Sequence, residues 1–79
     1  IKDFDLIVCN ILADVIISII PNIARILNFD GKLILSGILS SQQREIIKIL
    51  NLNHLSVDNV SSEKDWVCIN STKLFNKMT

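Results

Sequence analysis

Asn10 is the residue of this 79-residue chain best suited to chemistry. It lies near the end of an apolar run, residues 6–11 (LIVCNI), and its carboxamide can both donate and accept hydrogen bonds. A continuous apolar run is typical of a strand buried on both faces of a parallel sheet. In open α/β sheets, ligands bind outside the carboxyl ends of such strands. The pattern therefore predicts a site at Asn10, although Asn at a strand end also commonly forms a turn with its own backbone.

Four other features could bear chemistry, and each also has a structural explanation. Asp14 is favoured as a helix cap over a catalytic base. Two explanations are equally good for Ser36-Gly37. The backbone could come close to a ligand there, which glycine permits, or the strand could end there and loosen into a turn. His54 has no partner for metal binding or catalysis in the pattern, so we expect it at solvent or at a helix end. Trp66 is favoured as a core anchor over a stacking platform, because one aromatic residue makes no cage.

The two cysteines do not indicate a disulfide framework or a metal site. Cys9 and Cys68 each lie in an apolar, strand-like run, where a free cysteine behaves as a small hydrophobe. No second Cys or His stands at ligand spacing from either, which disfavours zinc. We therefore expect two buried, reduced thiols and no bound metal.

Composition restricts the functional classes further. The chain is 49% hydrophobic and 20% charged, which is too apolar for a disordered protein. Its eight basic and eight acidic residues form no basic stripe, and aromatic residues are few, so we expect no direct nucleic-acid binding. The longest apolar segment, residues 15–20, is too short to span a membrane, and the N-terminus lacks the layout of a signal peptide. A cytoplasmic location follows as the default expectation.

The elements expected to position Asn10 alternate between strands and helices. The predicted strands cover residues 6–11, 32–38, 55–60 and 66–70, with helices between the first three and a polar connector at 61–65. Because a strand, a helix and a strand form a right-handed βαβ unit, the first two strands should be parallel. The short connector predicts that the last strand is antiparallel to the one before it. Residues 73–79 are expected to form a fraying tail.

Local signals set the expected ends of the two helices. An apolar stripe predicts the buried face of the first helix, with Asp14 as its cap and a kink or break at Pro21. Asp30-Gly31 should stop this helix, since glycine tolerates a positive φ. Ser40 with Gln43 resembles a capping box at the start of the second helix. The stripe of the first helix comprises Ile16, Ile19, Ile20, Ile23 and Leu27.

Three segments of the chain resemble one enzyme family. Residues 5–14 (DLIVCNILAD) are similar to the D-L-[IV]-[VI]-A-N-I-L-A-x segment of the bacterial methyltransferases that modify ribosomal protein eleven of the large subunit. Residues 31–39 (GKLILSGIL) resemble that family's G-x-L-I-L-S-G-I-L strand, and Asp65-Trp66-Val67 resembles its E-W-V word. The order β-α-β-α-β-β, with the last strand antiparallel, also resembles the C-terminal half of a class I methyltransferase, a Rossmann-like α/β fold.

The resemblance implies a function, a cofactor and a substrate. It implies a protein methyltransferase that uses S-adenosyl-L-methionine to methylate amino groups, on lysine or at the α-amine, of a large-subunit ribosomal protein. It places Asn10 at the cofactor and the reacting amine, with the backbone carbonyls of Asn10 and Ile11 sharing that work. A carbonyl acceptor that fixes the N–H groups of an amine supplies orientation for in-line attack.

The same resemblance implies that part of the catalytic domain is missing from these residues. The family's glycine-rich cofactor loop and its N-terminal recognition domain have no counterpart among residues 1–79, which contain only Gly31 and Gly37. We therefore expect a partial catalytic domain that is inactive by itself, exposes the apolar edge of its first strand, and accepts a complementing N-terminal fragment as partner. The alternative is a non-catalytic remnant or a small α/β binding module.

Overall fold

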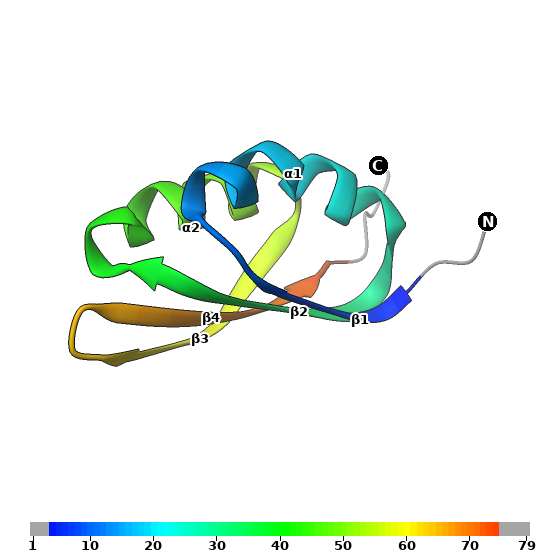
Figure 1. The fold of residues 1–79 in the computed structure, drawn as a ribbon. Coiled ribbons are helices and arrows are strands. Elements are labelled where there is room, and N and C mark those ends of the chain that lie inside the picture. Colours follow the sequence, from blue (N-terminus) through cyan, green and yellow to red (C-terminus); the bar gives the residue numbers. More distant parts are fainter. Residues whose placement is uncertain (1–3, 75–79) are drawn as a thin grey trace.

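A computed structural model describes residues 4–74 of the chain. Its elements follow the order predicted from the sequence, two βα units and then two strands (Figure 1). The element bounds are β1 (Phe4–Asn10), α1 (Ala13–Ile26), β2 (Leu27–Leu39), the 3-10 turn η1 (Ser40–Gln42), α2 (Gln43–Leu52), β3 (Leu55–Glu63) and β4 (Trp66–Lys73).

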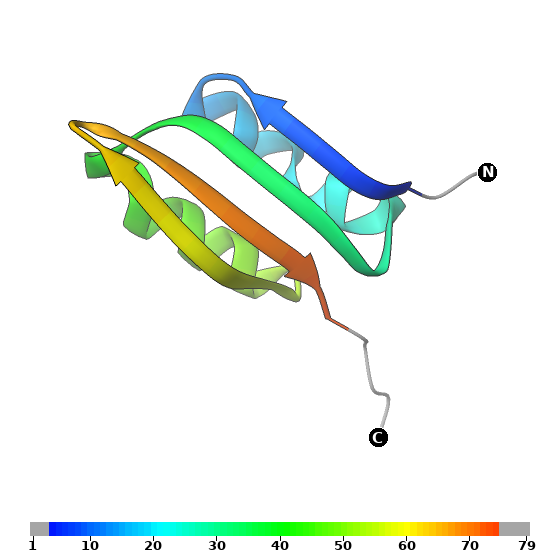
Figure 2. The same ribbon diagram turned by 90° about the horizontal axis from the view of Figure 1, so that it is seen from below.

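The four strands form one mixed sheet in the order β1-β2-β4-β3 (Figure 2). β1 and β2 are parallel, and Asn10 pairs with Ser36 in their register. β4 runs antiparallel to both of its neighbours, and the short connector predicted this orientation for its pair with β3. Since β1 and β2 are parallel, their carboxyl ends meet at the same edge of the sheet, where Asn10 lies.

Both helices pack on the same face of the sheet, and the opposite face carries no helix (Figures 1 and 2). We call this uncovered side the open face. The core lies between the helices and the sheet, where the expected stripe of α1 packs, with Ile19 partly buried. The residues of the core are Ala13, Ile16, Ile20, Ile23, Leu27, Leu33, Leu35, Ile38, Ile46, Leu50, Leu55, Val67 and Ile69.

The predicted Asp14 cap and a break at Pro21 are both wrong, while a kink at Pro21 stays a prediction. The helix begins at Ala13, so Asp14 lies in the first turn, and the capping position falls to Leu12, whose side chain makes no capping bond. In the first turn, the negative Asp14 carboxylate still interacts favourably with the positive end of the helix dipole. The helix is also not broken at Pro21. Buried isoleucines on both sides of the proline, Ile20 and Ile23, hold the two halves of the helix on the same core.

The end of α1 also differs from the prediction. The helix ends at Ile26, ahead of Asp30-Gly31, and β2 is correspondingly longer than expected. The positive φ, 67°, is at Asp30, not at Gly31. Gly31 is needed for space, because a Cβ there would lie 2.7 Å from the backbone oxygen of Asn28.

The capping box predicted at Ser40 and Gln43 lies one residue earlier, at Leu39 and Gln42. η1 occupies Ser40–Gln42 before α2 begins, and the Leu39 N–H donates to Oε1 of Gln42 at 2.9 Å. Ser40 instead joins the β3–β4 turn: its N–H and its hydroxyl both donate to the backbone oxygen of Asp65, at 2.8 and 3.0 Å. That turn is shorter than the expected connector, since β3 extends to Glu63 and only Lys64-Asp65 lies between the strands.

Lys73 lies in β4 and not in a tail. Its Nζ donates to the backbone oxygen of Leu27 at 2.8 Å and lies 4.8 Å from the centre of the Phe29 ring. Leu74 follows, and its backbone N–H donates to the backbone oxygen of His54 at 2.9 Å. The rest of the predicted tail, residues 75–79, lies outside the described residues. His54 is exposed just beyond α2, as expected, with a φ of 62°.

The prediction that β1 is buried on both faces is wrong. β1 is an edge strand with β2 as its one neighbour in the described sheet, and Leu6 and Val8 are 55% and 61% exposed. The reason is geometric: the helices cover only the face toward which Ile7 and Cys9 point. The thiols of Cys9 and Cys68 are free, as expected, but each residue is only partly buried. No helix among residues 4–74 is long and apolar enough to cross a membrane.

Candidate functional site

The site predicted at Asn10 lies where β1 ends and the chain turns into α1. Asn10 is exposed, and across residues 4–74 its carboxamide makes no hydrogen bond to another side chain or to the backbone. Ser36 lies beside it on β2, and its hydroxyl is 3.4 Å from the backbone oxygen of Cys9, to which it donates. The Asn10 amide therefore keeps its donors and its acceptor for a ligand.

Gly37 brings the backbone of β2 against the Asn10 side chain. Its φ is 77°, and a Cβ at this position would lie 2.5 Å from Oδ1 of Asn10. The register of β2 against β4 shifts between Leu35 and Ile38, so β2 also leaves its regular ladder here. The expected strand end is wrong, because β2 continues through Ser36-Gly37 to Leu39, and a close approach to a ligand stays a prediction. A close approach within the chain does occur. The approach is to Asn10.

A pocket of about 470 Å³ opens at this point, lined by Asn10, Ile11, Leu12, Gly37 and Trp66. Ile11 and Leu12 are 39% and 75% exposed, so the pocket has apolar walls beside one carboxamide. No side chain in this lining ionises near neutral pH. The arrangement can hold and orient a small group, and it supplies no acid or base to transfer a proton.

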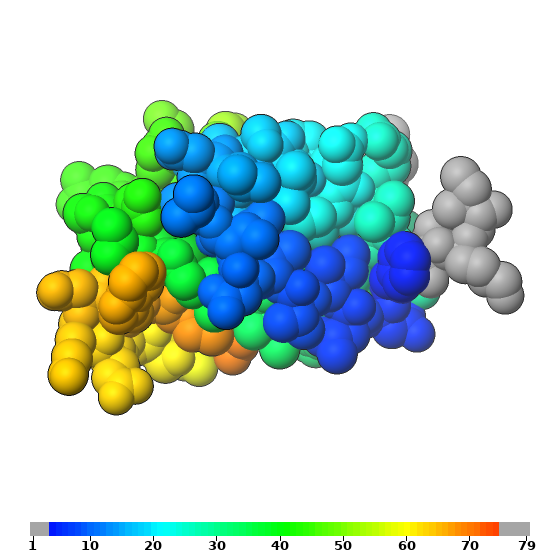
Figure 3. Space-filling model, viewed as in Figure 1, coloured from blue at the N-terminus to red at the C-terminus, as the bar shows by residue number. Residues whose placement is uncertain are grey.

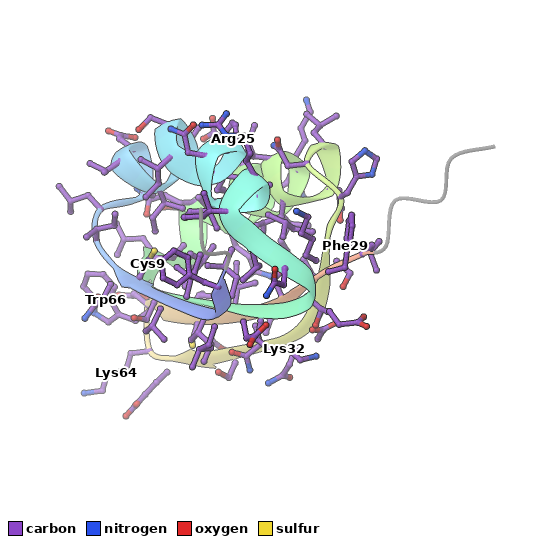
Figure 4. The ribbon with its side chains drawn as sticks, turned by 90° about the vertical axis from the view of Figure 1, so that its right-hand side faces the viewer. Cys9, Arg25, Phe29, Lys32, Lys64 and Trp66 are labelled. Carbon is purple, nitrogen blue, oxygen red and sulfur yellow. The ribbon has the colours of Figure 1, made fainter. Side chains whose placement is uncertain are left out.

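Trp66 is the lining residue that the sequence interpretation missed. It is 54% exposed, so its assignment as a core anchor is wrong. On β4, Val67, Ile69 and Ser71 are buried beneath the helices, which turns Trp66 to the open face. In Figure 4 its ring projects outward on the side where β1 continues into α1. The alternation of Val67 and Ile69 with more polar neighbours was the signal that could have indicated this.

A second, more polar hollow of about 300 Å³ adjoins the first. It shares Gly37 and Trp66 with the first pocket, so these two residues border both spaces. The carboxylate of Glu63 is its one acidic group. The other residues that line it are Ser36, Ser61, Ser62, Val67 and Cys68.

One thiol near the site has a shifted pKa. Burial raises the pKa of the Cys9 thiol, which keeps the thiol protonated at neutral pH beneath the carboxyl end of β1. Within the described part of the chain, no three His, Cys, Asp or Glu side chains gather closely enough to hold a metal ion.

Comparisons with known proteins give one consistent result. The family model described as "Ribosomal protein L11 methyltransferase (PrmA)" matches residues 1–74. A curated relative of that name from Prochlorococcus marinus (strain MIT 9515) is 55% identical over 73 residues, which is 92% of this chain and 24% of the relative. One from Cyanothece sp. (strain PCC 7425 / ATCC 29141) is 38% identical over 68 residues, 86% of this chain and 23% of the relative. The chain therefore spans about a quarter of the length of these relatives.

Solved structures extend the comparison to the fold. The ribosomal protein L11 methylase from Lactobacillus delbrueckii subsp. bulgaricus superposes with a TM-score of 0.88 at 34% identity, covering 94% of this chain and 38% of that one. The N-methyltransferase NodS from Bradyrhizobium japonicum WM9 superposes with a TM-score of 0.71 at 18% identity, covering 95% of this chain and 53% of that one. The second likeness concerns the fold alone.

Proposed function

This chain belongs to the ribosomal protein L11 methyltransferase family, and we propose that it is the C-terminal half of a catalytic domain that methylates amino groups of ribosomal protein L11. The family uses S-adenosyl-L-methionine. The residues of this chain form one wall of the active site, and a complementing N-terminal polypeptide forms the other. The reaction takes place in the cytoplasm.

The observation that carries this proposal is the free carboxamide of Asn10 beside the apolar walls of the 470 Å³ pocket. An amine attacks only when it is neutral and aligned with the methyl group. Oδ1 of Asn10 accepts an N–H of that amine and fixes its direction, which lowers the entropic part of the barrier. The neighbouring backbone carbonyl of Ile11 offers a second acceptor, and Trp66 and Leu12 place apolar walls beside the amine.

The same pocket fits only the reacting end of the cofactor. Bound S-adenosyl-L-methionine supplies an electrophilic methyl on a sulfonium, whose sulfur leaves neutral, so no strong acid is needed. The apolar walls at Ile11 and Leu12 suit that end. The lining contains neither a carboxylate to accept bonds from ribose hydroxyls nor a glycine-rich turn. This incomplete fit supports a partial domain that neither binds the cofactor tightly nor turns over by itself.

The test is reconstitution of methyl transfer. The 79-residue chain is co-expressed with the part of the Prochlorococcus marinus (strain MIT 9515) relative that lies outside the matched segment. The pair is then incubated with ribosomal protein L11 and methyl-labelled S-adenosyl-L-methionine. We expect label in L11 from the pair and none from either component alone.

Two variants make the result specific to the site. Asn10→Ala in the pair should abolish labelling, while Asn51→Ala, at an exposed position on α2, should leave it unchanged. Labelling that survives Asn10→Ala would contradict the orienting role. Micromolar affinity of the isolated chain for S-adenosyl-L-methionine in calorimetry would contradict the incompleteness of the site.

A further inference from the structure

The tip of the β3–β4 hairpin leads directly into Trp66 and contains no buried side chain. Lys64-Asp65 forms the turn, and all residues from 61 to 66 are exposed. Lys64 has a φ of 57°, in the left-handed region that residues other than glycine rarely adopt. A backbone in this conformation persists only where surrounding contacts hold it. The turn therefore depends on contacts from outside the hairpin.

Ser40 makes such a contact from the segment between β2 and α2. Its backbone N–H and its hydroxyl both donate to the backbone oxygen of Asp65, at 2.8 and 3.0 Å. Leu39 and Trp66 form the last pair of the β2–β4 register, so these bonds continue that ladder by one residue. Figure 3 shows the turn, in gold and orange, lying against the green segment that leads into α2.

The segment that contains Ser40 is itself anchored. The Leu39 N–H donates to Oε1 of Gln42 at 2.9 Å, which fixes the start of η1. Ile38 before this segment and Ile46 after it are fully buried. Ser40 therefore connects an exposed turn to the core.

The oxygen that accepts both bonds belongs to the peptide group that joins Asp65 to Trp66. Because a peptide group is planar, fixing its oxygen also fixes its nitrogen, which is the backbone nitrogen of Trp66. Trp66 is the first residue of β4, so the turn lies immediately before it. The rotamers open to a side chain depend on the φ and ψ of its own backbone. The two bonds from Ser40 therefore restrict the direction of the indole.

The direction of the indole matters because Trp66 borders both hollows of the site. It lines the 470 Å³ pocket together with Asn10 and the 300 Å³ hollow together with Glu63. Since Trp66 is 54% exposed, packing alone does not fix its ring. A shift of the Asp65–Trp66 peptide would move the ring relative to the Asn10 amide.

We propose that Ser40 is a positioning residue that holds the Trp66 indole as a wall of the pocket beside Asn10. Its effect on methyl transfer rests on the proposed function, whereas its effect on the order of Trp66 does not. A merely structural bond would stabilise the hairpin and leave the indole of the folded chain unchanged. The two roles therefore differ in what they do to Trp66.

The first test uses the 79-residue chain, in which Trp66 is the single tryptophan. Ser40→Ala removes the hydroxyl bond, so time-resolved fluorescence anisotropy of the folded chain should show a larger amplitude of fast indole motion. Ser40→Thr keeps a hydroxyl and should restore the native anisotropy. Ser41→Ala removes an exposed hydroxyl that makes no hydrogen bond within residues 4–74, and it should change nothing. Circular dichroism checks that each variant folds. A Ser40→Ala chain with native anisotropy overturns the proposal, whatever its stability.

The second test measures methyl transfer in the reconstituted pair. Ser40→Ala should raise the KM for ribosomal protein L11 by about two- to tenfold, the effect of one neutral hydrogen bond, and leave the KM for S-adenosyl-L-methionine unchanged. The rise should disappear in a Trp66→Leu background, because Ser40 acts through the indole. An unchanged KM for L11, or an equal further rise in the Trp66→Leu background, overturns the role in the site. If the native pair transfers no methyl group, the proposed function fails, and the anisotropy alone decides whether Ser40 positions Trp66.

Discussion

Gly37→Ala is the substitution that tests most directly how the site is built. Gly37 combines a φ of 77° with a missing Cβ that would lie 2.5 Å from Oδ1 of Asn10. The substitution therefore perturbs the backbone of β2 and the position of the Asn10 amide together. We expect a loss of stability and a displaced Asn10 side chain.

The magnitude follows from two contributions. A non-glycine residue in the left-handed region costs roughly 1–2 kcal/mol, and the lower entropy of the unfolded alanine chain returns roughly 0.4–1 kcal/mol, which leaves about 1 kcal/mol. The contact with Oδ1 is too short to persist, but Asn10 is exposed and can leave its rotamer for about 0.5–1.5 kcal/mol. The free energy of unfolding should therefore fall by about 2 kcal/mol. For a domain of this size the melting temperature should fall by about 10 °C.

The assay is urea unfolding followed by circular dichroism, with the fluorescence of Trp66, the single tryptophan, as a local probe of the pocket. A double-mutant cycle with Asn10→Ala separates the two contributions. Removing the Asn10 amide should reduce the cost of Gly37→Ala to the backbone part, about 1 kcal/mol. An equal cost in both backgrounds would refute the contact, and a cost near zero would refute the backbone argument as well.

Three further predictions concern the core and the titration of the chain. Ile20→Ala at a fully buried position should lower the free energy of unfolding by about 2–5 kcal/mol in urea titration, whereas Val15→Ala on the exposed side of α1 should change it by less than about 0.5 kcal/mol. Ser71→Ala should cost about 1 kcal/mol by the same measurement, because it removes the donor that the buried Ser71 hydroxyl offers to the backbone oxygen of Ser56. Burial raises the pKa of Cys9 above 9.0, so the folded state keeps this proton longer than the unfolded state; stability is full below pH 9.0 and should decline as pH rises through the folded-state pKa. Cys9→Ala should flatten that decline, and an unchanged pH profile would refute the shift.

The sequence predicted the elements well and their surroundings poorly. The order of strands and helices, the parallel pair and the antiparallel last strand all follow from apolar runs and short connectors, which are local signals. The burial of Leu6 and Val8 was wrong because an apolar run does not specify what covers it. Asp14 was predicted as the helix cap from its residue type, but α1 begins one residue earlier, at Ala13. Gly31 was predicted to adopt a positive φ for the same kind of reason, but Asp30 has the positive φ and Gly31 is needed because a Cβ there would clash.

The position of Asn10 at a strand end could be predicted from its place in the apolar run alone. The exposure of Trp66 could be predicted only by knowing which face of β4 the helices cover. A tryptophan in an apolar segment is usually buried, and here Val67 and Ile69 take the buried side of the strand. The pocket joins residues 10–12 to residue 66, which only the pairing of β4 with β2 brings together. No spacing within the sequence indicates that pairing.

The irregularity in β2 connects the core to the site. Between Leu35 and Ile38 the chain advances three residues on β2 for two on β4, from Ile69 to Val67. This extra residue changes which side chains face the helices, so that Leu35 and Ile38 are both buried although an unbroken strand would turn one of them outward. The same extra residue puts Gly37 at the positive φ that lets the Asn10 amide lie against β2. A straight strand would fill the core less well and would also move the backbone away from Asn10, so the packing of β2 and the geometry of the pocket depend on one feature.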